Sequence, residues 1–429
     1  MLDEHTLEVV KKSAPSILVK VLGMLIALLV SIALGRLLGA EGLGIINLTT
    51  KISSILIILA LLGTPQLLIK ELAIAVNDKN WQEVKSLIKS GLIVNSISAL
   101  LLIALIVILA PWISKYIFDN KDITIPLVVA TCAVLFQVIS RVYASGIIAY
   151  KKIWQSNLVN EGLSIAVVGV LLGVWYVFGF TIDVIRVAVF YFVGRVVVTT
   201  YVVIYWRTLF KNKAEFHNKS RALIKKSFPF LMVSATAIIA ANIDSVMVGW
   251  LSSVKEVAYY TVASRIALLT IFFLQVTNAA LSPKLATLYK AGKIKEMNKM
   301  VQRVTSGLIC VAILPVIVFA LFGESILGLW GAEFSSGYWL LIVLSLGQLV
   351  NIGTGSAGLL LVMTGFEKIQ ANISFIAIGI NLLINFILIG QFGALGAAIA
   401  TAIALSFENI SKVIYAKKKT GVMTLPFNF

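Results

Sequence analysis

Charged residues are scarce in this chain of 429 residues. Lys and Arg number 36 and Asp and Glu 19, so only 13% of the residues are charged, whereas 59% are hydrophobic. A soluble domain carries about 25% charged residues, and the composition therefore excludes a soluble fold. At roughly 20 apolar residues per membrane span, the length has room for about a dozen transmembrane helices and for no sizeable extramembrane domain.

Cysteine is scarcer still. The only two cysteines, Cys132 and Cys310, both lie inside apolar runs, which excludes a disulfide framework and the usual metal-ligand spacings. We therefore expect no bound metal and no cofactor. The N-terminus carries acids before its basic pair and has no small-residue cleavage site, so we expect no signal peptide and a retained first span.

Long apolar runs, bounded by charges or by Gly and Pro clusters, dominate what is present. We predict twelve spans, at 14–38, 43–69, 87–110, 123–149, 157–178, 183–206, 227–250, 257–282, 302–322, 337–363, 370–389 and 394–416. Because lipid offers no partner to backbone amides, such runs must be helical. The predicted fold class is an all-α polytopic membrane protein.

The net charge of +17 is distributed unevenly over the predicted loops. If the N-terminus is cytoplasmic, the inner segments hold 26 Lys and Arg, and the outer connections hold only four. Cytoplasmic loops of membrane proteins are enriched in these residues. This bias predicts that both termini are cytoplasmic, and it explains the charge without nucleic acid as a partner.

Matched segments recur about half a chain apart. KKSAP at 11–15 returns as KKSFP at 225–229, and SGLI at 90–93 returns at 306–309, with nearly the same offset. These matches predict an internal repeat of two six-helix lobes, 1–215 and 216–429. Since six is even, both lobes enter from the same side, the parallel arrangement of some secondary transporters.

Ionisable residues inside spans indicate functional sites by default, because each is costly in lipid. Lys51 and Arg265 are separated by the same offset as KKSAP and KKSFP, so they occupy equivalent places in the two lobes, and we expect them in one central cavity. Lys20 is a third candidate, although it can also snorkel. The alternative for Lys51 and Arg265 is a structural role, with their charges held by neighbouring helix carbonyls or by Asp244 and Glu408.

The remaining buried charges allow two interpretations each. Arg141 and Arg195 are either cavity cations or members of core ion pairs. Asp244 is the best acid for ion coupling, with a structural partnership to Arg265 as the alternative. Glu161 and Glu408 are weaker coupling candidates, because Glu161 lies near a span end and Glu408 is placed for an i,i+4 pair with Lys412. A cavity rich in cations and poor in acids should hold an anion.

Several segments resemble one membrane transporter family along essentially the whole chain. They are SIALGRLLGAEGLGIINL at 31–48, VMVGWLSSVKEVAYYTVASRI at 246–266, LSPKLATLY at 281–289, and the FEKI and GALGAAIATAIA segments near the C-terminus. The chain resembles the polysaccharide transporter family, the Wzx-type oligosaccharide flippases of the multidrug/oligosaccharidyl-lipid/polysaccharide exporter superfamily.

This resemblance implies a transporter with alternating access and no enzyme activity. It implies transport of a polyprenyl-diphosphate-linked oligosaccharide across the cytoplasmic membrane, with coupling to H⁺, Na⁺ or the membrane potential. In related lipid II flippases, basic residues on the first, second and eighth helices are held to bind the diphosphate, and Lys20, Lys51 and Arg265 stand on those helices here. We expect a monomer that works beside a polysaccharide polymerase or glycosyltransferases.

Three other functions are alternatives to a polysaccharide flippase. An ion-coupled multidrug antiporter of the same superfamily should carry acids in its N-lobe cavity, where only Glu161 is available. A lipid II flippase tends to carry two further C-terminal helices. A membrane-embedded glycosyltransferase or polymerase would need a large outer loop or paired carboxylates.

Overall fold

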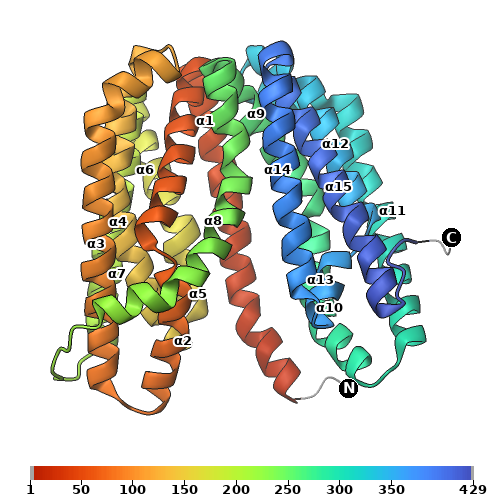
Figure 1. The fold of residues 1–429 in the computed structure, drawn as a ribbon. Coiled ribbons are helices and arrows are strands. Elements are labelled where there is room, and N and C mark those ends of the chain that lie inside the picture. Colours follow the sequence, from red (N-terminus) through yellow and green to blue (C-terminus); the bar gives the residue numbers. More distant parts are fainter. Residues whose placement is uncertain (1–3, 427–429) are drawn as a thin grey trace. The chain divides into compact units, whose positions relative to one another are not determined.

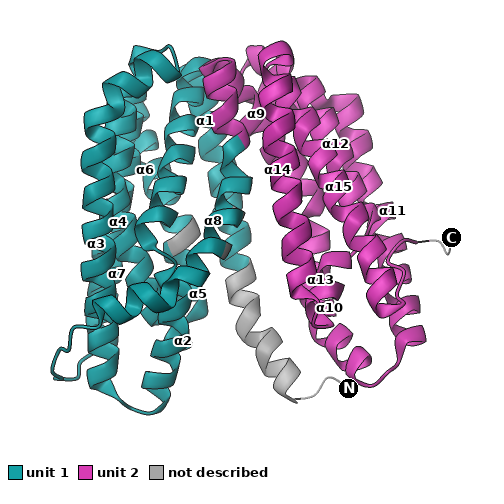
Figure 2. Cartoon of the chain, viewed as in Figure 1, with its two compact units in different colours: residues 1–243 teal, residues 244–429 magenta. Residues whose placement is uncertain are grey.

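The computed structural model describes the backbone of residues 4–426 and the side chains of residues 18–426, except those of 160, 161, 233 and 237. Within these ranges all regular secondary structure is helical and no strand occurs (Figure 1). The predicted all-α class is therefore confirmed. The chain divides into two compact units, Met1–Ile243 (unit 1) and Asp244–Phe429 (unit 2), as coloured in Figure 2.

Unit 1 contains seven α-helices and the first part of an eighth. These helices are α1 (Glu4–Leu61), α2 (Thr64–Asn77), α3 (Trp81–Trp112), α4 (Thr124–Ala149), α5 (Ile153–Asn157), α6 (Leu163–Val177), α7 (Val184–Leu209) and α8 (Ser220–Leu251), of which α8 ends in unit 2. A π-helical segment, η3 (Leu158–Gly162), joins α5 to α6.

The first helix is broken by a glycine. The backbone of Gly39 leaves helical geometry (φ 68°, ψ −176°), a conformation that is open essentially only to glycine, so α1 consists of two helical segments. Residues 18–61 would measure about 66 Å as one straight helix, roughly twice the thickness of a bilayer core. The break therefore separates the predicted spans 14–38 and 43–69.

The second predicted span ends earlier than expected. The helix stops at Leu61, and Gly63 (φ 73°) turns the chain before Pro65 begins α2. Pro65 suits the first turn of α2 because the amide that proline lacks would have no intrahelical partner there. The core of unit 1 lies beneath this turn, where Leu68 and Leu72 of α2 pack with residues of α3, α4 and α7.

Unit 2 contains the end of α8 and seven further α-helices. They are α9 (Val254–Ala267), α10 (Phe272–Lys290), α11 (Ile294–Leu327), α12 (Tyr338–Gly353), α13 (Ala357–Met363), α14 (Glu367–Phe392) and α15 (Ala394–Thr420). A 3₁₀ segment, η4 (Leu268–Ile271), links α9 to α10. A core cluster joins Leu281, Leu285 and Met297 to Leu360 and Leu361.

Ten helices in the described part of the chain are long and apolar enough to cross a membrane, and α6 is a shorter apolar helix. The chain is thus a multi-pass helical membrane protein. The count of twelve spans, the repeat, and the lobe boundary at 215 stay predictions. Unit 1 extends past residue 215 because the segment after it is bonded to α3, as shown below.

Candidate functional site

Lys51 and Arg265, the two cations that the predicted repeat matches, lie equally far along their helix segments. Lys51 follows the break at Gly39 by as many positions as Arg265 follows Ser253, the N-cap of α9. Each is half-buried within its own unit and about 18 Å along its helix segment. Arg265 also lies in the last turn of α9, where the helix dipole favours a cation. A cavity that contains both residues stays a prediction.

The other predicted cations all lie in unit 1. Lys20 is exposed on α1, and Arg141 on α4 and Arg195 on α7 are half-buried. The hydroxyl of Thr199 lies 2.8 Å from the Phe136 carbonyl oxygen, and this contact joins α7 to α4. The two guanidinium groups on these helices are close enough to repel each other. The structure therefore brings Arg141 and Arg195 into one neighbourhood.

Asp244 is the centre of a polar cluster inside unit 2. Its Oδ2 accepts hydrogen bonds from the hydroxyl of Tyr260 at 2.8 Å and from that of Thr401 at 2.9 Å, and its Oδ1 accepts one from Nδ2 of Asn385 at 2.6 Å. The same Nδ2 also donates to Oδ1 of Asn381 at 3.0 Å. Four helices, α8, α9, α14 and α15, thus supply one group of oxygen-bearing side chains.

The Asp244 cluster is partly buried, with Asp244 and Thr401 themselves half-buried. Tyr260 is 4% exposed, Asn385 is fully buried, and Oδ1 of Asn385 has no hydrogen-bond partner among the described residues. A buried polar atom without a partner is costly, so its presence calls for an explanation such as a bound ion. Carboxylate, amide and hydroxyl oxygens are the ligands of hard cations, whereas groups of three His, Cys, Asp or Glu are absent from the described region.

Glu408 and Glu161 are the two weaker candidates for ion coupling. Glu408 accepts from Nζ of Lys412 and from the Ser374 hydroxyl, both at 2.6 Å. This is the i,i+4 pair expected from the spacing, and it gives Glu408 a structural role on α15. The side chain of Glu161 lies outside the described residues, so its coupling role stays a prediction.

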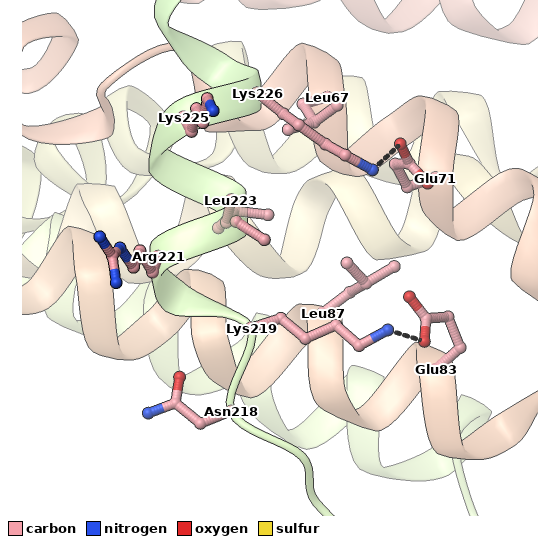
Figure 3. Close-up of a pocket in the computed structure, with 11 residues that line it drawn as sticks. Leu67, Glu71, Glu83, Leu87, Asn218, Lys219, Arg221, Leu223, Lys225 and Lys226 are labelled. Atoms are coloured by element: carbon pink, nitrogen blue, oxygen red, sulfur yellow. Dashed lines mark hydrogen bonds and ion pairs between the residues drawn. The ribbon is translucent and has the colours of Figure 1, made fainter.

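A charged pocket of about 650 Å³ lies where α8 begins. Glu71 of α2 and Glu83 of α3 form its acidic side, and Lys226 and Lys219 reach across to them (Figure 3). The Lys226 ion pair spans 3.5 Å. Arg221 extends from the opposite side of α8 (Figure 3). The ion pairs that line the pocket thus hold the start of α8 against α2 and α3.

The segment before α8 is held to α3 through its backbone. The amide of His217 donates to the hydroxyl of Ser86 at 3.0 Å, and the amide of Lys219 donates to that of Ser90 at 2.8 Å. Lys85 of α3 also donates to the carbonyl of Ala214. Both serine hydroxyls belong to fully buried residues. These contacts explain why unit 1 includes the residues that follow 215.

Sequence reasoning missed most of the Asp244 cluster. Tyr260 and Thr401 carry no signal, because single tyrosines and threonines are common in apolar helices. Asn381 and Asn385 could have been found, since two asparagines at i and i+4 share one face of an otherwise apolar helix. A buried amide pair in a membrane helix indicates a partner across a helix interface.

The ten long apolar helices among the described residues define a polytopic helical membrane protein. A solved inward-facing multidrug resistance MATE family transporter of the MOP superfamily superposes with a TM-score of 0.75 at 14% identity, over 93% of this chain and 94% of that chain. The lipid II flippase MurJ in an inward closed conformation gives 0.71 at 14% identity, over 95% and 87%.

The sequence matches the models of two protein families. The model of the polysaccharide biosynthesis protein family matches residues 9–289, and the MatE model matches residues 229–387. The chain belongs to the polysaccharide biosynthesis protein family. This result confirms the resemblance inferred from the sequence.

Curated relatives agree with this placement. The capsular polysaccharide biosynthesis protein CapF of Staphylococcus aureus is 23% identical over 85% of this chain and 94% of its own length. The probable low-salt glycan biosynthesis flippase Agl15 of Haloferax volcanii is 23% identical over 51% of this chain and 45% of its own length. The relatives named as flippases and the structural neighbours are transport proteins and not enzymes, as predicted.

Proposed function

We propose that the chain is a flippase that moves a polyprenyl-diphosphate-linked oligosaccharide from the cytoplasmic to the outer leaflet by alternating access. Membership of the polysaccharide biosynthesis protein family and its flippase relatives support this proposal. The proposed binding site rests on the matched placement of Lys51 and Arg265, which lie equally far along their helix segments.

The spacing of helix starts supports two lobes of six spans. Trp81 and Ile294, Thr124 and Tyr338, and Ile153 and Glu367 begin successive helices, and the members of each pair are separated by nearly the same half-chain offset. With the break at Gly39, and with α5, η3 and α6 counted as one span, unit 1 has room for six crossings before α8. An even number of crossings agrees with two cytoplasmic termini, as the charge bias predicts.

In this mechanism the diphosphate is drawn from the cytoplasmic leaflet by Lys20 and passes to Lys51 and Arg265. Charge-assisted hydrogen bonds to phosphate are strong where water is scarce. Arg141 and Arg195 add positive potential, because two neighbouring cations favour an anion more than either does alone. The head group leaves outward after the lobes rearrange.

We propose that the Asp244 cluster couples transport to an ion. Asp244, Asn385 and Thr401 offer oxygen ligands from three helices, so a bound Na⁺ or H⁺ would change how α8, α14 and α15 are held together. The unpartnered Oδ1 of Asn385 supports a cation of this kind. Glu161 stays a second coupling candidate, and the membrane potential is the alternative driving force.

The test replaces both matched cations. In vesicles that contain a fluorescent polyprenyl-diphosphate glycolipid, Lys51→Ala together with Arg265→Ala should slow flipping at least about 100-fold, because two hydrogen bonds to a charged group are worth about 3 to 6 kcal/mol. Protection of the fluorophore from a membrane-impermeant quencher reports the leaflet. The matched control is Lys418→Ala with Lys419→Ala, two exposed lysines at the end of α15.

The result separates the candidate functions. Full activity of the double variant, at normal protein levels, removes the diphosphate assignment. Protection of cells from cationic drugs without any glycolipid movement would identify a multidrug antiporter instead. A preference for lipid II over other glycolipids would identify a lipid II flippase. We also propose that the protein acts as a monomer in the cytoplasmic membrane, beside the enzymes that build or polymerise the glycan.

A further inference from the structure

A groove runs between α1 and α6 within unit 1. It has a volume of about 700 Å³ and is bounded by one face of each helix. Val30 (6% exposed) and Leu172 (4% exposed) lie deepest, and Leu29 and Val170, each 64% exposed, stand beside them. The groove is therefore apolar in its body and open at its rim.

Small residues give the groove its width. Ala33 lies on the α1 side and Ala166, Gly169 and Gly173 lie on the α6 side. A Cβ at Gly169 would lie 3.1 Å from Val30, whereas a Cβ at Gly173 would meet nothing within 4 Å. Space thus increases along α6 from Gly169 to Gly173.

The two ends of the groove differ. Gly23 and Gly162 lie just beyond one end, and there the helices approach so closely that a Cβ at Gly23 would sit 3.3 Å from the Gly162 Cα. The other end carries Arg36 and Tyr176, which are both exposed. A cation beside an aromatic residue is typical of the membrane–water interface. The groove is closed at its apolar end and open at its polar end.

Its length matches one leaflet. From Ile26 to Leu37 the α1 wall extends about 17 Å, close to half of a hydrocarbon core of about 30 Å. A hydrocarbon chain that enters beside Arg36 would reach the Gly23–Gly162 contact near the bilayer centre. The site therefore suits a lipid of one leaflet, and its cation suits a lipid whose head group is a phosphate.

We propose that this groove holds the isoprenoid chain of the translocated lipid in the leaflet on the Arg36 side, with Arg36 at its phosphate. An isoprenoid chain carries a methyl branch on every unit and is thicker than an acyl chain, which accounts for the small residues along both walls. The assignment rests on the proposed flippase function. On the charge bias, the Arg36 side is the outer leaflet, so the groove is an exit site for the product.

The experiment measures binding separately from transport. A polyprenyl phosphate with a photoreactive group in its chain is incorporated with the full-length protein into nanodiscs, and labelled peptides are mapped by mass spectrometry. We expect labels on α1 and α6, and Gly173→Leu should lower them about tenfold, the loss of burial of roughly two methylene groups. Gly390→Leu is the matched control, because a Cβ there also meets nothing within 4 Å.

Two further variants complete the test. Val170→Trp fills the groove from its exposed rim and replaces Gly173→Leu if that variant does not fold. Arg36→Gln should lower labelling by polyprenyl phosphate but leave labelling by the uncharged polyprenol unchanged. Equal displacement of the label by phosphatidylglycerol and by unlabelled polyprenyl phosphate would show an ordinary phospholipid site and overturn the proposal.

The outcomes distinguish a failure of the groove proposal from a failure of the flippase proposal. Normal glycolipid flipping with labels located elsewhere, or with full labelling of Gly173→Leu and Val170→Trp, overturns the groove and leaves the flippase intact. Labelling of the groove in a wild-type protein that moves no glycolipid overturns the proposed function and the description of the groove as an exit site.

Discussion

At the residue scale, Thr401 offers the sharpest test of the Asp244 cluster. Thr401→Val keeps the side-chain shape and removes one hydroxyl ligand, while Tyr260 and Asn385 still hold Asp244 in place. We expect flipping to need roughly tenfold more Na⁺ for half-maximal rate, since one hydrogen bond to a charged group is worth about 1.5 kcal/mol or more. The measurement is the flipping rate against sodium concentration at constant ionic strength.

Ser406→Ala is the control for this change. Ser406 lies on the same helix and its hydroxyl bonds to the Ala402 carbonyl, not to Asp244. If H⁺ is the coupling ion, sodium has no effect on either protein and the pH profile of Thr401→Val shifts instead. Identical sodium and pH responses in wild type and Thr401→Val would exclude the cluster as the coupling site.

Charged and neutral polar residues of these sites differ in how far they can be recognised from the sequence. Lys51 and Arg265 stand out in the sequence because a cation in an apolar run is rare and the predicted repeat offset pairs them; their role as a shared site stays a prediction. Tyr260 was not predictable, because its importance comes from contact with Asp244 on another helix. Polar clusters built from neutral side chains become visible only when packing brings the helices together.

At the scale of elements, the segment before α8 is held mainly by α3. Ser86→Ala with Ser90→Ala leaves the amides of His217 and Lys219 without their acceptors. Each loss should cost about 1 kcal/mol, so the melting temperature should fall by about 2 °C or more. Limited proteolysis within residues 210–219 should become faster.

Ser98→Ala, on the same helix but further from this segment, is the control and should leave both measurements unchanged. An unaltered melting temperature and unaltered cleavage in the double serine variant would show that the ion pairs of Lys219 and Lys226 are sufficient to hold the segment.

Helix boundaries show the limit of hydropathy at this scale. The predicted span 43–69 merges two structural elements, because Leu, Ile and Val continue across the turn at Gly63. The turn is fixed by a positive φ at Gly63, and hydropathy carries no information about backbone angles. The break at Gly39 fell between predicted spans because its neighbours 40–42 include Glu41 and Gly42, which lower the local hydropathy.

At the scale of the whole molecule, composition was sufficient for the fold class. A charged fraction of 13% and repeated apolar runs require membrane helices. The attachment of the segment 214–219 to unit 1 was not predictable, because it depends on hydrogen bonds to Lys85, Ser86 and Ser90 of α3. A repeat compares positions along the chain, whereas a compact unit depends on which segments touch.

Topology is the whole-molecule property that charge placement predicts most directly. In a variant with Cys132 and Cys310 replaced by alanine, Lys121→Cys should react with a membrane-impermeant maleimide in intact cells, and Lys213→Cys only after permeabilisation. Both positions are exposed, Lys121 before α4 and Lys213 before α8. The physical reason is that inner segments hold 26 of the Lys and Arg residues and outer ones four. Labelling of Lys213→Cys in intact cells would reverse the orientation, and would place the Arg36 end of the α1–α6 groove in the cytoplasmic leaflet.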